Sequence, residues 1–148
     1  CTCTPNDIRK YQARISGPLL DRIDIQVEVD NVKYDDLVSE EKEESSAQVK
    51  ARADAARKIQ RLRFEGSDVS CNSEMNENEL RKYCKLTDRG EELLRVSFER
   101  LKLSARARSR ILKVARTIAD LSYSEQILPE HLLEAVSYRT FGAENDEF

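Results

Sequence analysis

A single stretch of alternating residues sets the main constraint on the fold of this chain. Ile23, Ile25, Val27 and Val29 alternate with polar residues, which is the period-two pattern of a half-buried strand. It is the only clear strand pattern in the 148 residues. A lone strand cannot satisfy its own backbone hydrogen bonds, because a stable sheet needs neighbouring strands. The sequence therefore predicts that this strand belongs to a sheet whose other strands lie outside this chain.

The rest of the chain carries helical patterns. A first helix is expected to begin at Thr4-Pro5 and to end at Gly17-Pro18. Four main helices and one short helix are expected after residue 44, and each begins with a start signal. These signals are Ser45, the capping box Asn76-x-x-Glu79, Thr87, Ser104 and Pro129. We therefore predict a mainly α fold, in which a helix and a single strand precede a compact helical bundle.

Composition divides the chain into three parts. Residues 1–30 hold the first helix, a tight turn and the strand. Residues 31–44 form a linker that ends in the acidic run 39–44, a pattern typical of a solvated connection. Residues 45–148 form the helical domain, and this length allows a sizeable core.

Charge, hydropathy and cysteine content exclude several classes of protein. The net charge of −3 does not support a nucleic-acid footprint over the whole domain. No apolar run reaches the roughly 18 residues of a membrane span, so we expect a cytoplasmic protein without a membrane partner. Four cysteines do not make a secreted disulfide pattern. Cys1 and Cys3 form half of a possible metal site or are free thiols, and we favour free thiols because tetrahedral zinc needs four ligands.

The usual catalytic motifs are absent from the sequence. There is no glycine-rich phosphate loop ending in Lys-Ser/Thr, and no apolar run ends in paired acids that could hold magnesium. His131 is the single histidine, and we expect it on the surface in the first turn of the last helix. The chain is therefore not expected to be an enzyme by itself.

Arg22 is the first candidate residue for binding a phosphate group. Arginine is always charged, and its forked donors match phosphate oxygens. Arg22 follows the turn 16–20 and precedes the predicted strand. The alternative is a local ion pair with Asp21 or Asp24, and spacing alone favours that alternative.

A second group of basic residues begins at Ser104. At about 100° per residue, Arg106, Arg110 and Lys113 fall on one face of the predicted helix, beside its apolar stripe. These side chains could contact phosphate groups. The alternative is a solvated basic face, which the pattern alone slightly favours.

Four strings of this sequence resemble one family. They are RISGPLLDRID at 14–24, ESS at 44–46, LSAR at 103–106 and ILKVARTIADL at 111–121. Together they resemble the magnesium-chelatase-like, ComM-type AAA+ ATPases of bacteria. The likeness spans nearly the whole chain. It implies that the chain is the end of an ATP-binding core followed by the helical C-terminal lid.

The resemblance also implies roles and partners. Arg22 matches an arginine finger that reaches the nucleotide of a neighbouring subunit, and Arg106 matches the second sensor of the γ-phosphate. ATP and Mg²⁺ are then the expected cofactors of the full-length protein, which would hold the phosphate loop upstream. The expected assembly is a homo-oligomeric ring, with a hexamer as its expected form, whereas this chain alone is expected to be a monomer.

The resemblance further implies DNA as the substrate class, through branch migration during natural transformation. Arg110 and Lys113 on one face, and Lys50, Arg57 and Arg61 on another, are candidate phosphate contacts. Two other readings stay open. One is a small DNA-binding module of helix-turn-helix type, which the arginine-rich helix from Ser104 supports. The other is a scaffold that docks a partner through its helices.

Overall fold

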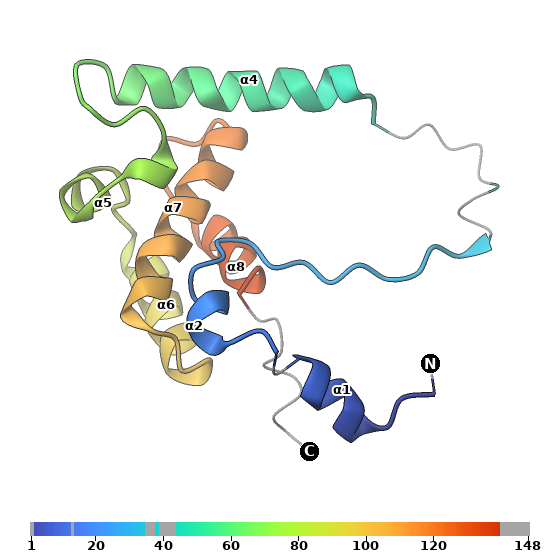
Figure 1. Ribbon diagram of the computed structural model, residues 1–148. Coiled ribbons are helices and arrows are strands. Elements are labelled where there is room, and N and C mark those ends of the chain that lie inside the picture. Colours follow the sequence, from blue (N-terminus) through green and yellow to red (C-terminus); the bar gives the residue numbers. More distant parts are fainter. Residues whose placement is uncertain (1, 13, 35–37, 39–43, 140–148) are drawn as a thin grey trace.

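The structure is a computed structural model that describes residues 2–12, 14–34, 38 and 44–139. It is mainly helical, as predicted (Figure 1). No helix in this part of the chain combines the length and apolarity needed to cross a bilayer. The helices are α1 Pro5–Gln12, α2 Gly17–Leu20, α4 Ser46–Arg63, the 3₁₀ turn η1 Asn72–Glu74, α5 Glu77–Tyr83, α6 Asp88–Arg100, α7 Ala105–Leu121 and α8 Pro129–Ser137.

The predicted helix starts of the bundle are confirmed. The side chains of Ser45, Asn76, Thr87 and Ser104 each accept a hydrogen bond from a backbone N–H in the first turn of the helix that follows. Ser45 and Asn76 also close capping boxes. Pro129 is the first residue of α8. Each cap satisfies donors that a helix N-terminus leaves unpaired, so short local motifs place the helix boundaries.

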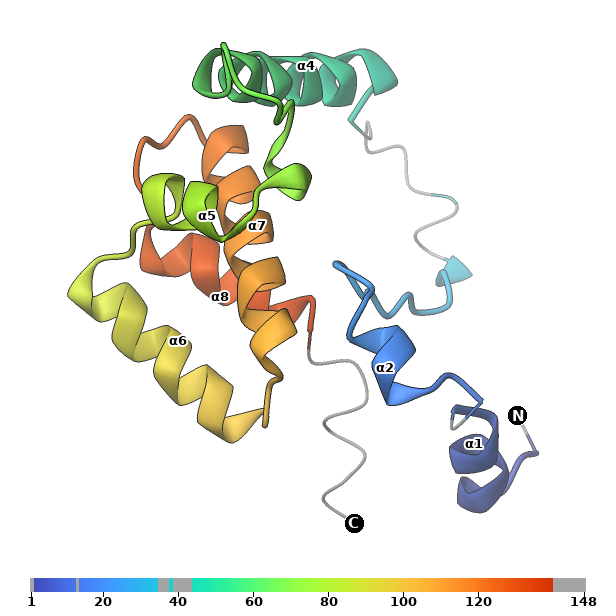
Figure 2. The same cartoon turned by 60° about the vertical axis from the view of Figure 1, so that its left-hand side comes forward.

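Helix α7 is the centre of the bundle. It contacts α4, η1, α5 and α8, and α6 packs against α8 (Figure 2). Its buried face continues into a core supplied by α5, α6, α8 and the segments that follow α4, η1 and α7. Fully buried members include Ile111, Ala115, Ala119, Ile127 and Leu132. Burial of one large aliphatic side chain contributes about 1.5–3 kcal/mol, so this shared core holds the helices together.

Residues 23–29, predicted as a strand of a sheet whose other strands lie outside this chain, form no strand with the described residues. This segment is extended, but it joins no ladder within the described ranges. Its apolar side chains stay exposed, from 39% for Ile23 to 85% for Val29. The N–H of Gln26 donates to the carbonyl of Tyr138 at 3.0 Å, and among the described residues this is the one backbone-to-backbone hydrogen bond between the segment and the bundle. The alternation sets which side chains would share a face, but none of the described residues forms a neighbouring strand that pairs with this segment.

The start of the first helix is confirmed, but α1 ends at Gln12, and Gly17, the predicted stop, begins α2. The apolar face of α1 is also uncovered. Thr4 and Asp7 cap its start reciprocally. Ile8, Tyr11 and the nearby Ile15 are 45%, 71% and 46% exposed. The first part of the chain therefore presents apolar residues that no described segment buries. Residues 35–37 and 39–43 of the predicted linker lie outside the described residues.

The expected surface position of His131 is wrong. Its side chain is 6% exposed, and its Nδ1 accepts a hydrogen bond from the N–H of Leu128 at 3.1 Å. The buried arc of α8 consists of His131, Leu132, Ala135 and Val136. Leu133 lies outside this arc and is 55% exposed. The phase of a helix of nine residues is set by its packing against α7, which its own sequence does not specify.

Candidate functional site

Arg22 lies in a tight turn directly after α2. The N–H groups of Leu19 and Leu20 donate to the carbonyl of Ser16 at 2.9 and 3.1 Å, and the N–H of Arg22 donates to the carbonyl of Leu19 at 3.0 Å. These bonds form one helical turn that ends where the extended segment begins. Arg22 is exposed at this corner. The local backbone therefore holds the Arg22 side chain away from the bundle core.

The two acids beside Arg22 are paired with arginines of the bundle. Asp24 forms an ion pair with Arg110 of α7. Asp21 lies 3.6 Å from a guanidinium nitrogen of Arg139, which also donates to the carbonyl of Ile23. The side chain of Arg22 forms no hydrogen bond or ion pair with the part of the chain that the structure describes. The local ion pair that spacing favoured does not form, because tertiary contacts occupy both acids.

Arg106 is the second arginine predicted to contact phosphate, and its guanidinium is also unoccupied. It is the second residue of α7, next to the cap that Ser104 makes with the N–H of Ala107 at 3.2 Å. Its side chain is exposed and has no hydrogen-bond or ion-pair partner within the described ranges. Arg110 follows one turn later and binds Asp24. The segment that carries Arg22 therefore docks beside the α7 face that carries Arg106.

The other predicted phosphate contacts of α7 are engaged within the chain. The Nζ of Lys113 donates to the carbonyl of Ser73 at 2.8 Å, and Arg110 holds Asp24. The basic face predicted from spacing thus separates into two roles. Arg106 is available to a ligand, whereas Arg110 and Lys113 connect α7 to the rest of the fold.

The unoccupied arginines fit phosphate oxygens by charge and by donor geometry. A metal does not have a comparable site, since no three acids, histidines or cysteines gather among the described residues. Cys3 is an exposed free thiol, and Cys1 lies outside the described residues.

Sequence reasoning missed a buried charged cluster centred on Asp120. Both carboxylate oxygens of Asp120 accept hydrogen bonds from Arg63 of α4, one of them at 2.7 Å. Asn72 of η1 donates to Asp120 at 2.8 Å, and the Nε of Arg116 donates to it at 3.1 Å. Asp120 is 1% exposed and Arg116 is 3% exposed. Arg116 and Asp120 are four residues apart on the apolar side of α7. This placement is the sequence signal that could have predicted a buried ion pair.

The Asp120 cluster joins four parts of the bundle. Arg116 also donates to the carbonyls of Ser124 and Glu125 at 2.5 and 2.8 Å, after α7 ends. Burial lowers the pKa of the Arg116 guanidinium, and the neighbouring Asp120 carboxylate opposes that shift. No buried side-chain nitrogen or oxygen among the described residues lacks a partner. The cluster therefore fixes the C-terminal end of α4 on α7 with a complete set of hydrogen bonds.

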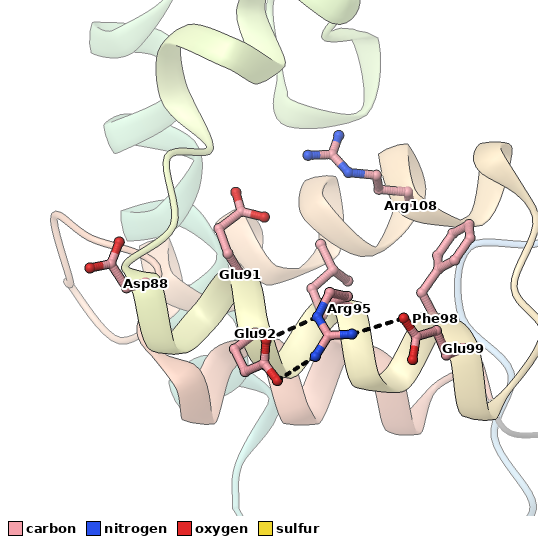
Figure 3. A pocket seen from close by; sticks show the side chains of 8 residues that line it. Asp88, Glu91, Glu92, Arg95, Phe98, Glu99 and Arg108 are labelled. Carbon is pink, nitrogen blue, oxygen red and sulfur yellow. Dashed lines mark hydrogen bonds and ion pairs between the residues drawn. The ribbon is translucent and has the colours of Figure 1, made fainter.

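A groove of about 520 Å³ lies between α6 and α7 (Figure 3). Phe98 and Leu94 supply apolar lining, and Arg95 is held between Glu92 and Glu99 at 2.7 and 2.9 Å. Figure 3 shows Arg108 of α7 across the groove from this ion-pair array. The groove holds no nucleophile next to a base. It therefore offers no catalytic arrangement of its own.

Cys84 is expected to resist modification in the folded protein. Burial raises the pKa of its thiol to about 11, and the sulfur lies 3.7 Å from the carbonyl of Leu112, to which it can donate. At pH 8 the reactive thiolate of Cys84 is then a very small fraction, whereas Cys3 is exposed. We expect iodoacetamide at pH 8 to label Cys3 much faster than Cys84, as read by peptide mass spectrometry. Urea should remove the difference, and equal labelling rates in the native protein would contradict the buried position.

Two family models match the chain. The model described as magnesium chelatase, subunit ChlI C-terminal, matches residues 43–139. The model described as magnesium chelatase, subunit ChlI, matches residues 1–37. The first match covers most of the helical bundle, and the second covers the segment with α1, α2 and Arg22.

The chain is also similar to longer curated proteins. It is 40% identical over 137 residues to the competence protein ComM of Haemophilus influenzae. It is 42% identical over 139 residues to the uncharacterized protein YifB of Salmonella typhimurium, and 31% identical over 143 residues to the uncharacterized protein Rv2897c of Mycobacterium tuberculosis. These matches cover 92%, 93% and 97% of the chain, but 26%, 26% and 28% of the relatives. The chain thus spans about a quarter of the length of these relatives.

Proposed function

Because the chain belongs to the magnesium-chelatase-like family and is related to ComM, we propose that it is the C-terminal part of an AAA+ ATPase and supplies two phosphate-facing arginines to that enzyme. The proposed roles are an arginine finger for Arg22 and a nucleotide sensor for Arg106. The full-length protein is proposed to form a homo-oligomeric ring in the cytoplasm and to act on DNA.

One observation carries this proposal. Arg22 has acids on both sides in sequence, yet both acids are paired with other arginines. A guanidinium that is exposed and unneutralised at a fixed corner is available to an anion from outside the chain. The uncovered apolar residues of 8–29 also fit a segment that packs against further protein.

The proposed chemistry is charge stabilisation. Phosphoryl transfer is accelerated mainly by positioning and electrostatics, and an arginine finger contributes about 10³–10⁵-fold. ATP with Mg²⁺, when bound, supplies the phosphoryl group that is transferred. Arg22 donates hydrogen bonds to phosphate oxygens of the adjacent subunit's nucleotide, so hydrolysis depends on assembly of the ring. The metal ligands belong to residues outside the described part of this chain.

Arg106 has a different proposed role. It lies at the start of α7, so a contact with the γ-phosphate pulls on the N-terminal end of the central helix. The rest of the bundle moves with α7, because the shared core and the Asp120 cluster hold the other helices to it. Presence of the γ-phosphate then changes the angle between lid and core, as in hinge-type domain closure.

Replacement of Arg106 by alanine tests this sensor role. We expect the full-length R106A variant to lose most of its preference for ATP over ADP, because the lost guanidinium contacts only the γ-phosphate. The measurement is nucleotide binding by calorimetry with a non-hydrolysable ATP analogue and with ADP. Arg89 is a matched control, since it is also exposed and is also the second residue of its helix, α6. An R106A variant with the same preference as R89A would refute the sensor role.

The helix-turn-helix alternative is less favoured by the described contacts. A recognition helix needs several free polar side chains to read base edges. In α7, Arg110 and Lys113 are already engaged with Asp24 and the Ser73 carbonyl. We therefore keep the ATPase proposal.

A further inference from the structure

Helix α4 is the most basic element of the chain. Its 18 residues contain six lysines and arginines and one acid, Asp54, although the whole chain has a net charge of −3. Helix α7 has a similar excess, but its Arg110, Lys113 and Arg116 are engaged within the fold. A strongly basic helix in an acidic chain is suited to bind a negatively charged partner.

Most of α4 stands away from the bundle. Its buried residues are Ala56 and Gln60, both in its C-terminal half. Figures 1 and 2 show α4 lying across one end of the bundle, and in Figure 1 its N-terminal half extends past α7. At 1.5 Å per residue, the helix is about 27 Å long. It is therefore an exposed arm that the bundle holds near one end.

The free cations lie on the side of α4 that faces away from the bundle. At 100° per residue, Arg57, Lys58 and Arg61 fall within about 100° of one another, and this arc is centred about 130° from the buried Ala56 and Gln60. All three are exposed, and none forms a hydrogen bond or ion pair with the residues that the structure describes. We call these three residues the α4 basic face. The one nearby acid, Asp54, is already bound to Lys50.

The charges near Asp54 are close enough to act on it. The hydrogen bond from Lys50 holds the pKa of Asp54 below its usual value, and Arg57 and Arg61 add to the same shift. Arg57 and Arg61 are one turn apart, so they repel each other as like charges at i and i+4. A bound polyanion would relieve that repulsion and would release the counterions of its own phosphates.

We propose that the α4 basic face binds the sugar–phosphate backbone of a nucleic-acid strand. This inference rests on the proposed action of the full-length protein on DNA, and it names the contact surface. The contact is to the backbone rather than to the bases. The ammonium group of Lys58 and the guanidinium groups of Arg57 and Arg61 lie on one convex helix face, where they can reach phosphate oxygens. Such contacts add affinity without reading sequence.

The position of α4 also couples this surface to the nucleotide sensor. Arg106 and Asp120 lie near opposite ends of α7, about 21 Å apart along the helix. Arg63, at the C-terminal end of α4, binds Asp120 through both carboxylate oxygens. A tilt of α7 that begins at Arg106 therefore carries the α4 basic face with it.

The test removes three charges from α4 and, separately, three charges from another surface. The R57Q/K58Q/R61Q variant of the full-length protein loses the α4 basic face but keeps good helix formers. The matched control is R81Q/K85Q/R89Q, which removes three exposed cations from α5, the start of α6 and the turn between them. Binding of a fluorescent DNA of mixed sequence, as duplex and as single strand, is measured at several salt concentrations. Circular dichroism checks the helix content of each variant.

We expect the α4 variant to bind DNA about tenfold or more weakly at moderate salt, with a salt slope smaller by about 2–3 units, whereas the control stays within about twofold of the parent. Equal losses in both variants would overturn the inference, because general charge would then explain binding. Unchanged DNA binding in the α4 variant, or loss of ring assembly in place of DNA affinity, would also overturn it.

The outcomes separate this inference from the proposed function. If R22A keeps ATP turnover while the α4 variant loses DNA affinity, the finger role fails and the α4 surface stands. If R22A loses turnover while the α4 variant binds DNA as the parent does, the finger role stands and the α4 surface fails.

Discussion

Replacement of Arg22 by alanine is expected to lower ATP turnover of the full-length protein by about 10³- to 10⁵-fold. The reason is the loss of a guanidinium that stabilises charge on the transferred phosphoryl group. ATP binding should be largely kept, since the finger acts on the nucleotide of a neighbouring subunit and mainly in the transition state. Phosphate release under saturating ATP, together with a nucleotide-binding titration, separates the two effects.

Two controls sharpen the Arg22 experiment. Arg9 of α1 is also exposed and unpaired within the described ranges, so R9A removes the same charge from the same part of the chain. The R22K variant keeps the positive charge but loses the forked donors of the guanidinium group, so it should keep only part of the parent activity. Mixed rings of R22A with a subunit that lacks its catalytic acid should regain some turnover. Failure of that rescue in assembled rings would refute action across the interface.

The largest expected effect on stability is at Asp120. Its removal in D120A leaves Arg116 buried without its carboxylate partner and leaves Arg63 and Asn72 without theirs. Breaking a buried ion pair on one side costs about 3–5 kcal/mol of unfolding free energy. For a domain of this size, that corresponds to a decrease of roughly 10–30 °C in the unfolding midpoint. Thermal unfolding followed by circular dichroism measures it.

Asp54 provides the matched control for this second experiment. Both residues are aspartates on helices and both bind a cation, but the Lys50–Asp54 pair is exposed. Surface ion pairs contribute little, so D54A should leave the unfolding midpoint close to that of the parent. D120N should lie between, because an amide keeps one acceptor for the arginines and loses the charge. A D120A midpoint equal to that of D54A would show that the cluster does not hold the bundle.

Local sequence signals predicted much of the fold. Ser45, Asn76, Thr87, Ser104 and Pro129 begin helices as predicted, because a cap or a proline acts on backbone groups within one turn. The core stripe of α7 follows from its period, since Ala107, Ile111, Ala115 and Ile118 are all buried. These features need no knowledge of distant segments.

Features that depend on distant partners were predicted less well. The alternation of 23–29 describes a strand correctly only when a neighbouring strand exists, and here the segment meets the bundle through single contacts. The buried position of His131 depends on how α8 packs on its neighbours. The Asp120 cluster draws on α4, η1 and α7, so no local window contains it.

The candidate site also combines features that the sequence predicts with features that depend on distant partners. Residue type and family likeness drew attention to Arg22 and Arg106, because a forked and permanently charged donor suits phosphate. Spacing alone paired Arg22 with Asp21 or Asp24. Only the tertiary structure decided which residues pair with those acids, since Arg110 of α7 and Arg139, just after α8, are 86 and 118 residues away from them in sequence. Ion pairs form between side chains that folding brings close in space. The sequence alone therefore determined which side chains could bind phosphate. The fold determined which of them stay free to do so.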